Sequence, residues 1–85
     1  MQRFDVVDTN IEDRSMTLRS ARGRMHVARA TAEMPEIGDV LEGLPPALGS
    51  ALLVQPSGQV VRVNFDLVDV SQDDALERLY ASLTP

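Results

Sequence analysis

Hydrophobic and polar residues alternate along residues 60–67 with the period of a β-strand. The apolar face consists of Val61, Val63, Phe65 and Leu67, and the other face consists of Val60, Arg62, Asn64 and Asp66. Alternation of this kind, with many β-branched residues, is typical of a strand that buries one face. We therefore predict a strand here, with the first set of side chains pointing into the core.

A helical pattern follows directly, at about residues 71–83. Its apolar positions are Leu76, Leu79, Tyr80 and Leu83. Their spacing of i, i+3, i+4 and i+7 places them on one side of a helix. Ser71 suits the N-cap, and Asp73 and Asp74 place negative charge in the first turn. Arg78 follows Asp74 by four residues, so the two can pair across one helical turn.

Shorter strand patterns precede residue 60. We expect strands at about residues 4–7, 15–19, 24–31 and 51–54, and another that begins at Val40 and Leu41. Turn-forming residues separate them, at Asp8-Thr9-Asn10, Gly23, 35–39 and 56–58. Residues 43–49 contain Pro45-Pro46, and proline cannot donate to a β-ladder. That segment is therefore predicted to be a connector or a strand edge.

The two strands around Gly23 should form a hairpin with one buried face. The side chains expected on its inner face are Met16, Leu18, Met25 and Val27. Those expected on its outer face are Thr17, Arg19, Arg24 and His26, with Arg22 near the tip.

Five to six short strands and one terminal helix predict a mainly β fold. We expect residues 1–85 to form one domain, a small antiparallel β-barrel, because a chain of 85 residues can build a single core. The C-terminal helix should pack across one opening of the barrel or on one face. An OB-like or SH3-like barrel is the alternative.

Composition narrows the possible chemistry. The net charge of −5 opposes binding to nucleic acid, which needs surplus basic residues. The chain has no cysteine and one histidine, His26, which excludes thiolate and multi-histidine metal sites. It also lacks lysine and any Gly-x-Gly pair, so the phosphate-binding motifs of nucleotide enzymes are absent. We therefore expect a protein that is not an enzyme, has no cofactor and has no nucleic-acid partner.

Two further properties of the sequence bear on the location and the source of the protein. The sequence has no apolar run near the ~18 residues that cross a bilayer, so we expect no membrane association and a cytoplasmic protein. All eight basic residues are arginines, which fits a GC-rich bacterial genome.

Basic residues concentrate in one part of the chain. Residues 14–31 hold five arginines and His26 without an acid, whereas the other residues hold three arginines and all thirteen acids. The five are Arg14, Arg19, Arg22, Arg24 and Arg29. Two interpretations remain open: a solvated face that balances the acidic regions, or an anion site, since arginine binds phosphate and carboxylate in bidentate fashion. His26 is interpreted as a surface residue, with a ligand or phosphate contact as the alternative.

The order of several short motifs resembles that of PilZ domains. The motifs are Ser20-Ala21-Arg22-Gly23, Ile37-Gly38-Asp39, and the run Val68-Asp69-Val70-Ser71-Gln72-Asp73-Asp74 before Leu76 and Leu79. PilZ domains are small six-stranded bacterial barrels that end in a helix, and many bind cyclic di-GMP. The resemblance covers about residues 18–83 and implies that architecture.

The ligand motifs of that family are incomplete in this chain. Ser20 and Gly23 match the Asp/Asn-x-Ser-x-x-Gly motif, but Leu18 stands where the acid or amide should be. The family also has two arginines four residues apart upstream of the serine, and no two arginines here are four apart. The resemblance therefore implies a degenerate PilZ domain that acts through protein contacts.

Three hypotheses about function follow. The first is a non-enzymatic bacterial regulatory module that binds a protein partner. The second is a sensor of a small anion or cyclic dinucleotide, such as cyclic di-GMP. Its candidate ligand-binding residues are Arg14, Arg19, Ser20, Arg22, Gly23, Arg24 and His26. The third is a barrel that pairs with another copy through a strand edge, without a ligand.

Overall fold

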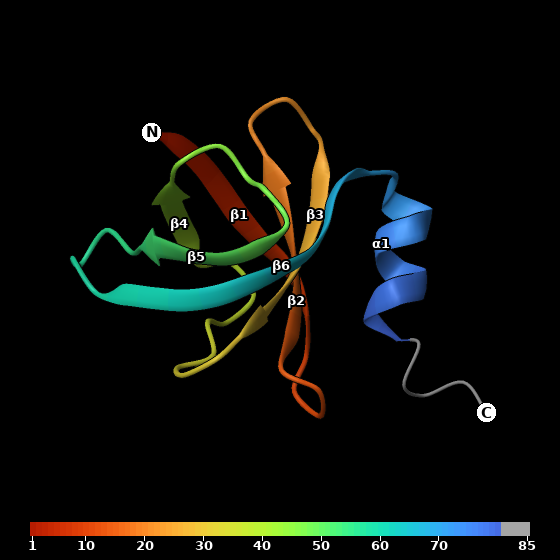
Figure 1. Cartoon of the computed structure of the whole chain (residues 1–85), viewed down its shortest axis with the longest axis horizontal. Helices are drawn as coiled ribbons and strands as arrows, with labels where there is room; N and C mark the ends of the chain where they lie inside the picture. The colour runs from red at the N-terminus through yellow and green to blue at the C-terminus, as the bar shows by residue number, and fades with distance from the viewer. Residues whose placement is uncertain (81–85) are drawn as a thin grey trace.

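The computed structural model describes residues 1–80, which form a closed antiparallel barrel of six strands and one helix. The elements are β1 (Gln2–Asn10), β2 (Ser15–Ser20), β3 (Met25–Ala30), β4 (Val40–Gly43), β5 (Gly49–Val54), β6 (Val60–Val70) and α1 (Gln72–Leu79). The strand order around the barrel is β1-β2-β3-β6-β5-β4, and β4 pairs with β1 to close the ring (Figure 1). The predicted fold class, a mainly β barrel with a C-terminal helix, is confirmed.

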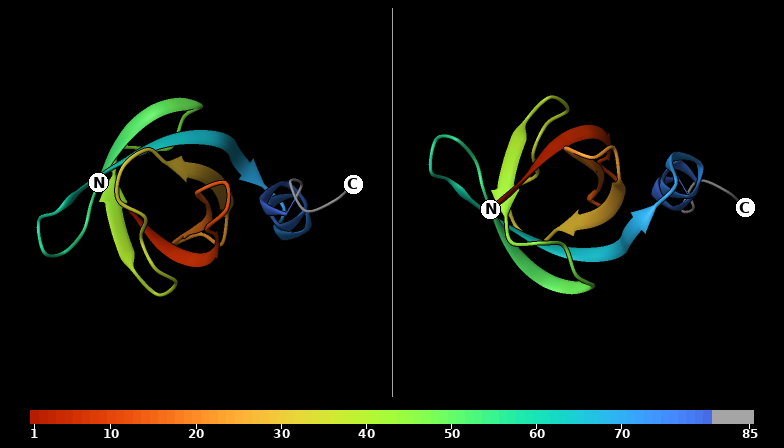
Figure 2. Two further views of the ribbon diagram at one scale, coloured as in Figure 1. Left: turned by 90° about the horizontal axis from the view of Figure 1, so that it is seen from below. Right: turned by 90° about the horizontal axis from the view of Figure 1, so that it is seen from above.

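Helix α1 lies outside the ring of strands, beside the end of β6 (Figure 2). It packs against β2, β3 and β6. Of the two placements expected for the helix, the structure has the one on a face of the barrel. Among residues 1–80, no helix is long and apolar enough to cross a membrane.

The barrel interior holds the larger of two apolar cores. Its buried members are Phe4, Val6, Met16, Leu18, Ala28, Ala30, Leu41, Leu53, Val61, Val63 and Phe65. Every strand contributes to this cluster, and burial of a large apolar side chain contributes about 1.5–3 kcal/mol. The prediction that Val61, Val63 and Phe65 point into the core is confirmed.

A second, smaller core lies between the barrel and α1. Met25, Val27 and Ala75 are buried there, with Val7, Leu67 and Val70 packed against them. Because α1 covers their outer faces, β2 and β3 are buried on both sides over most of their length.

This second core corrects the predicted hairpin. Met25 and Val27 are buried, but under the helix, and not in the interior with Met16 and Leu18. The register explains the difference, because Leu18 lies opposite His26 while Thr17 lies opposite Val27. Residues opposite each other share a face, so His26 belongs to the barrel interior.

Irregular register moves other side chains to unexpected faces. Between β3 and β6, Val27 lies opposite Leu67 while the next residue, Ala28, lies opposite Phe65. This bulge places Leu67 on the helix side, so the prediction that it points into the barrel is wrong. Similarly, the predicted turn at Asp8-Thr9-Asn10 is the second half of β1, paired with β2 beyond a bulge.

Helix α1 begins as predicted and is attached to β1 at its far end. The Ser71 hydroxyl accepts the Asp74 N–H at 3.1 Å, which confirms the N-cap. At the other end, the Asn10 side-chain amide donates to the Leu79 carbonyl at 2.7 Å, and the Tyr80 hydroxyl donates to the Asp8 carboxylate at 3.2 Å. The helix ends at Leu79, and the predicted extension to Leu83 lies outside the described residues.

Candidate functional site

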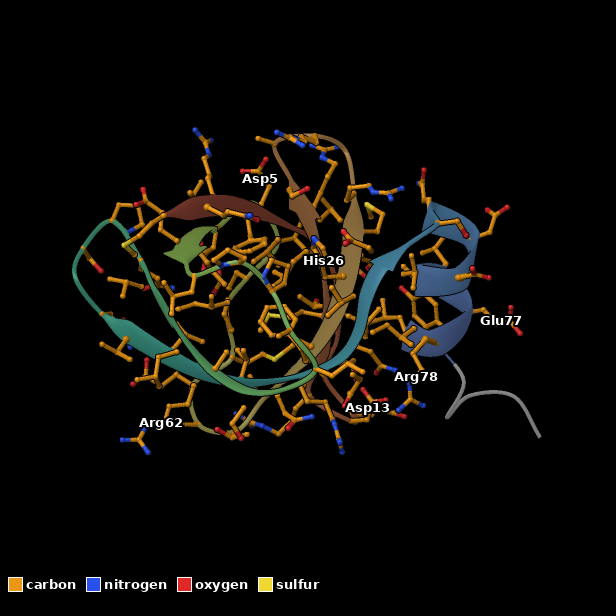
Figure 3. The ribbon with its side chains drawn as sticks, turned by 45° about the horizontal axis from the view of Figure 1, so that its top comes forward. Asp5, Asp13, His26, Arg62, Glu77 and Arg78 are labelled. Carbon is orange, nitrogen blue, oxygen red and sulfur yellow. The ribbon has the colours of Figure 1, made fainter. Side chains whose placement is uncertain are left out.

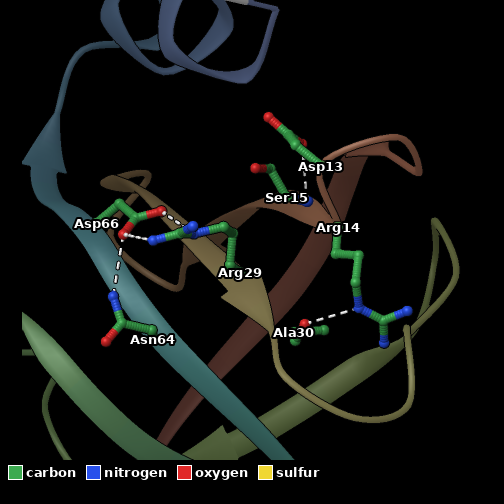
Figure 4. A network of polar contacts seen from close by, with 7 residues as sticks. All are labelled: Asp13, Arg14, Ser15, Arg29, Ala30, Asn64 and Asp66. Atoms are coloured by element: carbon green, nitrogen blue, oxygen red, sulfur yellow. Dashed lines mark hydrogen bonds and ion pairs between the residues drawn. The ribbon is translucent and has the colours of Figure 1, made fainter. Parts of the chain in front are cut away.

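Arg14 lies far from the other residues predicted to bind a ligand. It occupies the turn between β1 and β2, at the end of the barrel opposite the β2–β3 hairpin tip. Its Nε donates to the Ala30 carbonyl at 3.0 Å, and the Ala30 N–H donates to the Arg14 carbonyl at 2.9 Å (Figure 4). These bonds attach the turn to the end of β3, so Arg14 does not join a common patch with Arg22 and Arg24.

Arg29 forms an ion pair with Asp66 within the fold. Its guanidinium makes two bonds to the Asp66 carboxylate across the β3–β6 pair, of 3.1 and 3.3 Å (Figure 4). The Asn64 side-chain amide donates to the same carboxylate at 3.0 Å. The basic run of the sequence is therefore divided among separate places in the fold.

A cavity with a volume of about 590 Å³ lies at one end of the barrel. We call it the barrel mouth, and its lining consists of Gln2, Ser20, Arg22, Arg24, His26, Pro45, Pro46 and Asp69. The β2–β3 hairpin forms one wall and the β4–β5 connector forms another. The structure thus brings together Ser20, Arg22, Arg24 and His26, four of the seven candidate ligand-binding residues. The mouth also includes Gln2, Asp69 and the two prolines, which the sequence did not indicate.

The β2–β3 hairpin holds its basic residues at the mouth through a tight turn. The Gly23 N–H donates to the Ser20 carbonyl, and the Ser20 N–H donates to the Arg24 carbonyl, both at 2.9 Å. Gly23 has a φ of +79°, a conformation that glycine adopts without a steric penalty. Within residues 1–80, Arg22 makes no ion pair.

His26 is buried at the base of the mouth, and the prediction of a surface residue is wrong. Figure 3 shows His26 among the strands of the barrel, and the residue is 1% exposed. Its ring stands edge-on to Phe4 and Phe65, with centroids 5.7 and 6.3 Å away. The alternating pattern of β3 misled the prediction, because both faces of this strand are buried. The polar face inferred from Arg24, His26 and Ala28 in fact points into the barrel at His26 and Ala28.

The hydrogen bonds of His26 fix the position of its proton. The Nδ1 atom accepts the backbone N–H of Asp69 at 3.1 Å, so the neutral ring carries its proton on Nε2. That Nε2–H is buried and has no protein partner within residues 1–80. His26 can therefore donate one further hydrogen bond.

Three influences act on the pKa of His26. Burial lowers the pKa of the imidazole below its ordinary value, the Asp69 carboxylate opposes that change, and the Arg24 guanidinium lowers the pKa again. Burial dominates, so the ring stays neutral at pH 7.

Asp69 connects His26 with the surface of the mouth. It has a φ of +56°, a conformation rare for residues other than glycine. In this conformation its N–H reaches His26, and its exposed carboxylate lies 3.9 Å from Arg24 Nε. An exposed pair at that distance contributes little energy, so Arg24 is available to an anionic ligand.

A second cavity, of about 300 Å³, lies on the outer face of the barrel beside the start of α1. We call it the helix cleft, and its lining consists of Val7, Asp8, Thr17, Arg19, Gly23, Arg24, Met25, Val70, Ser71, Gln72 and Leu76. Arg19 and Gly23 thus belong to a different cavity from Ser20 and Arg22, and Arg24 borders both. Thr17 was predicted to face solvent but is 1% exposed, because the helix side of β2 is covered.

The donors of the mouth suit an anionic oxygen. The residues that line this cavity include two arginines, Ser20 and His26, whose side chains carry hydrogen-bond donors. Across residues 1–80, no group of three or more histidine, cysteine or acidic side chains is placed to hold a metal ion. Comparisons of the chain with protein-family models, with curated proteins and with solved structures found no match.

Proposed function

We propose that this chain is a non-enzymatic binding module, a PilZ-like barrel whose mouth takes an anionic group. The observation that carries the proposal is the grouping of Ser20, Arg22, Arg24 and His26 around one cavity, where Arg22 makes no ion pair within residues 1–80. An anionic group in the mouth would pair with the two guanidinium groups, and charge-assisted hydrogen bonds of this kind are the stronger ones.

The dimensions of the mouth suit a small molecule. Its volume of about 590 Å³ lies within the usual range of ligand pockets, and Pro45 and Pro46 give it an apolar wall. Leu18 stands at the position of the PilZ acid or amide and is buried in the barrel core, so it has no polar group to offer a base. We therefore propose a contact through phosphate or carboxylate oxygens, and the resemblance makes cyclic di-GMP the first probe.

An NMR titration of the labelled protein tests this function. Cyclic di-GMP and inorganic phosphate are added separately, and the expected shifts centre on Ser20, Arg22, Arg24 and Asp69 and on the imidazole of His26. The R22Q/R24Q double variant should lose about tenfold or more in affinity, because two charge-assisted contacts are removed. Raising the ionic strength should weaken binding to the wild type.

The control is Arg62→Gln, which removes an exposed arginine of β6 that does not border the mouth. This variant should bind like the wild type. An R22Q/R24Q protein with unchanged affinity would contradict the proposal, as would spectra that do not move with either probe at millimolar concentration.

A second candidate function is favoured by apolar side chains next to the mouth. Leu44 and Leu48 are 77% and 71% exposed, and they flank the two prolines of the β4–β5 connector. Neighbouring exposed apolar residues often mark a protein interface. We propose that a protein partner could dock there, and a photo-crosslinker at position 48 tests this. A salt-resistant product with a different protein supports docking, a product with a second copy supports self-association, and no product contradicts both.

A further inference from the structure

Thr17, which lines the helix cleft, carries the other buried polar side-chain atom without a partner in residues 1–80. Within residues 1–80, the buried side-chain atoms without a hydrogen-bond partner are Thr17 Oγ1 and His26 Nε2. Each residue lines a different cavity, Thr17 the helix cleft and His26 the mouth. A hydroxyl in this condition costs about 1–3 kcal/mol relative to one that is hydrogen-bonded. A ligand in the cleft that reached Thr17 would remove that cost.

Arg19 supplies an available positive charge at the same cavity. It follows Thr17 by two residues on β2, so both side chains are on the helix side of the strand. Arg19 is exposed and makes no ion pair within residues 1–80. Arg24 also borders the cleft but lies near the carboxylate of Asp69.

The acid that borders the cleft is engaged with other groups. The Asp8 carboxylate accepts the Tyr80 hydroxyl at 3.2 Å and the Thr9 N–H at 2.9 Å. Asp73 and Asp74 belong to the first turn of α1 but do not line the cavity. Arg19 is the arginine that lines this cleft alone, because Arg24 is shared with the mouth, and one unshared guanidinium favours a ligand with a single negative charge over a phosphate dianion.

Apolar side chains line part of the cleft, beside the polar residues Ser71 and Gln72 at the start of α1. Val7, Met25, Val70 and Leu76 contribute to its lining, and Leu76 remains 37% exposed although it lies on the inner half of the helix. A volume of about 300 Å³ equals the space of about ten water molecules at ~30 Å³ each. A ligand of this size has a short hydrocarbon or aromatic body.

We propose that the helix cleft is a second ligand site, which binds a small amphipathic carboxylate such as a short fatty acid or an aromatic acid. The carboxylate pairs with the Arg19 guanidinium and accepts the Thr17 hydroxyl. The hydrocarbon body covers Met25, Val70 and Leu76. This inference does not depend on the function proposed for the mouth, since the deciding residues Thr17 and Arg19 do not border that cavity.

Benzoate and hexanoate are suitable probes, and NMR of the full chain is the measurement. We expect shifts at Thr17 and Arg19, at the methyl groups of Met25, Val70 and Leu76, and at the first residues of α1. Arg19→Gln should weaken binding about tenfold or more, because it removes the charged partner of the carboxylate. Thr17→Val keeps the shape of the side chain without the hydroxyl, and should weaken binding by a smaller factor of about three to ten.

Two controls separate this site from non-specific binding. Benzamide matches benzoate in shape but has no charge, so it should bind at least about tenfold more weakly. Arg62→Gln removes an exposed arginine that borders neither cavity and should leave benzoate binding unchanged. Arg19 is exposed, so its variant should fold even if Thr17→Val does not.

The proposal fails if benzoate binds the wild type and Arg19→Gln equally, if benzamide binds as well as benzoate, or if the shifts centre on the mouth. It also fails if neither carboxylate shifts the cleft resonances at high millimolar concentration. None of these results would bear on binding of phosphate or cyclic di-GMP at the mouth.

Discussion

The two ring nitrogens of His26 have different surroundings, and this difference determines how the residue responds to acid. Nδ1 is occupied by the Asp69 N–H, and Nε2 already carries the proton. A second proton can be added only at Nδ1, where it would face another N–H. Protonation therefore removes a hydrogen bond and places a charge between Phe4 and Phe65, inside the barrel.

The fold should consequently lose stability in mild acid. The folded protein resists protonation of His26, whereas the unfolded chain takes up the proton near its ordinary pKa of about 6.5. The contribution of neutral His26 is thus complete above that pH and is lost progressively as the pH falls below it. Urea unfolding at pH 7.5, 6.5 and 5.5 measures the effect.

His26→Gln is the matched variant, because glutamine can accept the Asp69 N–H but does not titrate in this range. Its free energy of unfolding should fall less than that of the wild type between pH 7.5 and 5.5. Equal slopes for the two proteins would show that other groups cause the pH dependence.

At the scale of the element, Asn10 connects the end of β1 to the end of α1. Its side-chain amide donates to the carbonyl of Leu79, one of the last carbonyls of the helix, which have no partner inside it. Asn10 is buried, so water cannot readily replace the lost bond. Asn10 and Leu79 are 69 residues apart in the sequence, and their contact helps to hold the helix on the barrel.

Asn10→Ala should lower the free energy of unfolding by about 1–2 kcal/mol, because the Leu79 carbonyl loses its buried donor. Asn10→Asp should cost at least as much, since a carboxylate would face the carbonyl end of the helix. Chemical unfolding followed by circular dichroism gives both values. The control is Asn64→Ala on β6, expected to cost less than about 1 kcal/mol, and an equal loss there would contradict a special role for Asn10.

The sequence indicated which segments form strands, but not always which way their side chains point. Strand periodicity predicts two faces and assigns the polar one to solvent. On β3 that rule failed for His26, because α1 covers the outer face and the interior accepts a histidine whose Nδ1 is satisfied by Asp69. Leu67 changed faces through a bulge that leaves no mark in the alternation.

The sequence predicted only the part of the candidate site that is local in the chain. Ser20, Arg22 and Arg24 lie around one hairpin turn, so local sequence was enough to group them. Asp69 and Pro45 reach the mouth through the closure of the barrel, and a single sequence has no signal for which strand ends meet. Arg14 is near Ser20 and Arg22 in the sequence but lies at the other end of β2.

At the scale of the whole molecule, the weakest junction of the barrel is between β4 and β5. These strands are paired at one position, Glu42 opposite Val54, whereas β5 and β6 pair along the full length of β5. Gly43 ends β4 at this junction and lies against Leu53 in the core. A methyl group built on Gly43 would be 2.5 Å from Leu53 Cδ2 and 3.3 Å from the Leu52 carbonyl oxygen.

Gly43→Ala should therefore destabilise the protein by about 1–3 kcal/mol, because either the buried Leu53 or the β5 backbone must move. A double-mutant cycle with Leu53→Ala tests the cause. Removing the leucine side chain should relieve the clash, so the double variant should be more stable than the two single losses predict together. Strict additivity would mean that the alanine does not meet Leu53.

The position of β6 has a consequence for synthesis of the protein. It is the last of the six strands to leave the ribosome, yet it lies between β3 and β5 in the finished barrel. Until residue 70 has emerged, a nascent chain has a free edge on each of those strands, and free edges can pair with other chains. Barrel closure is therefore delayed until β6 has been translated, and during that interval pairing of either edge with another chain competes with closure.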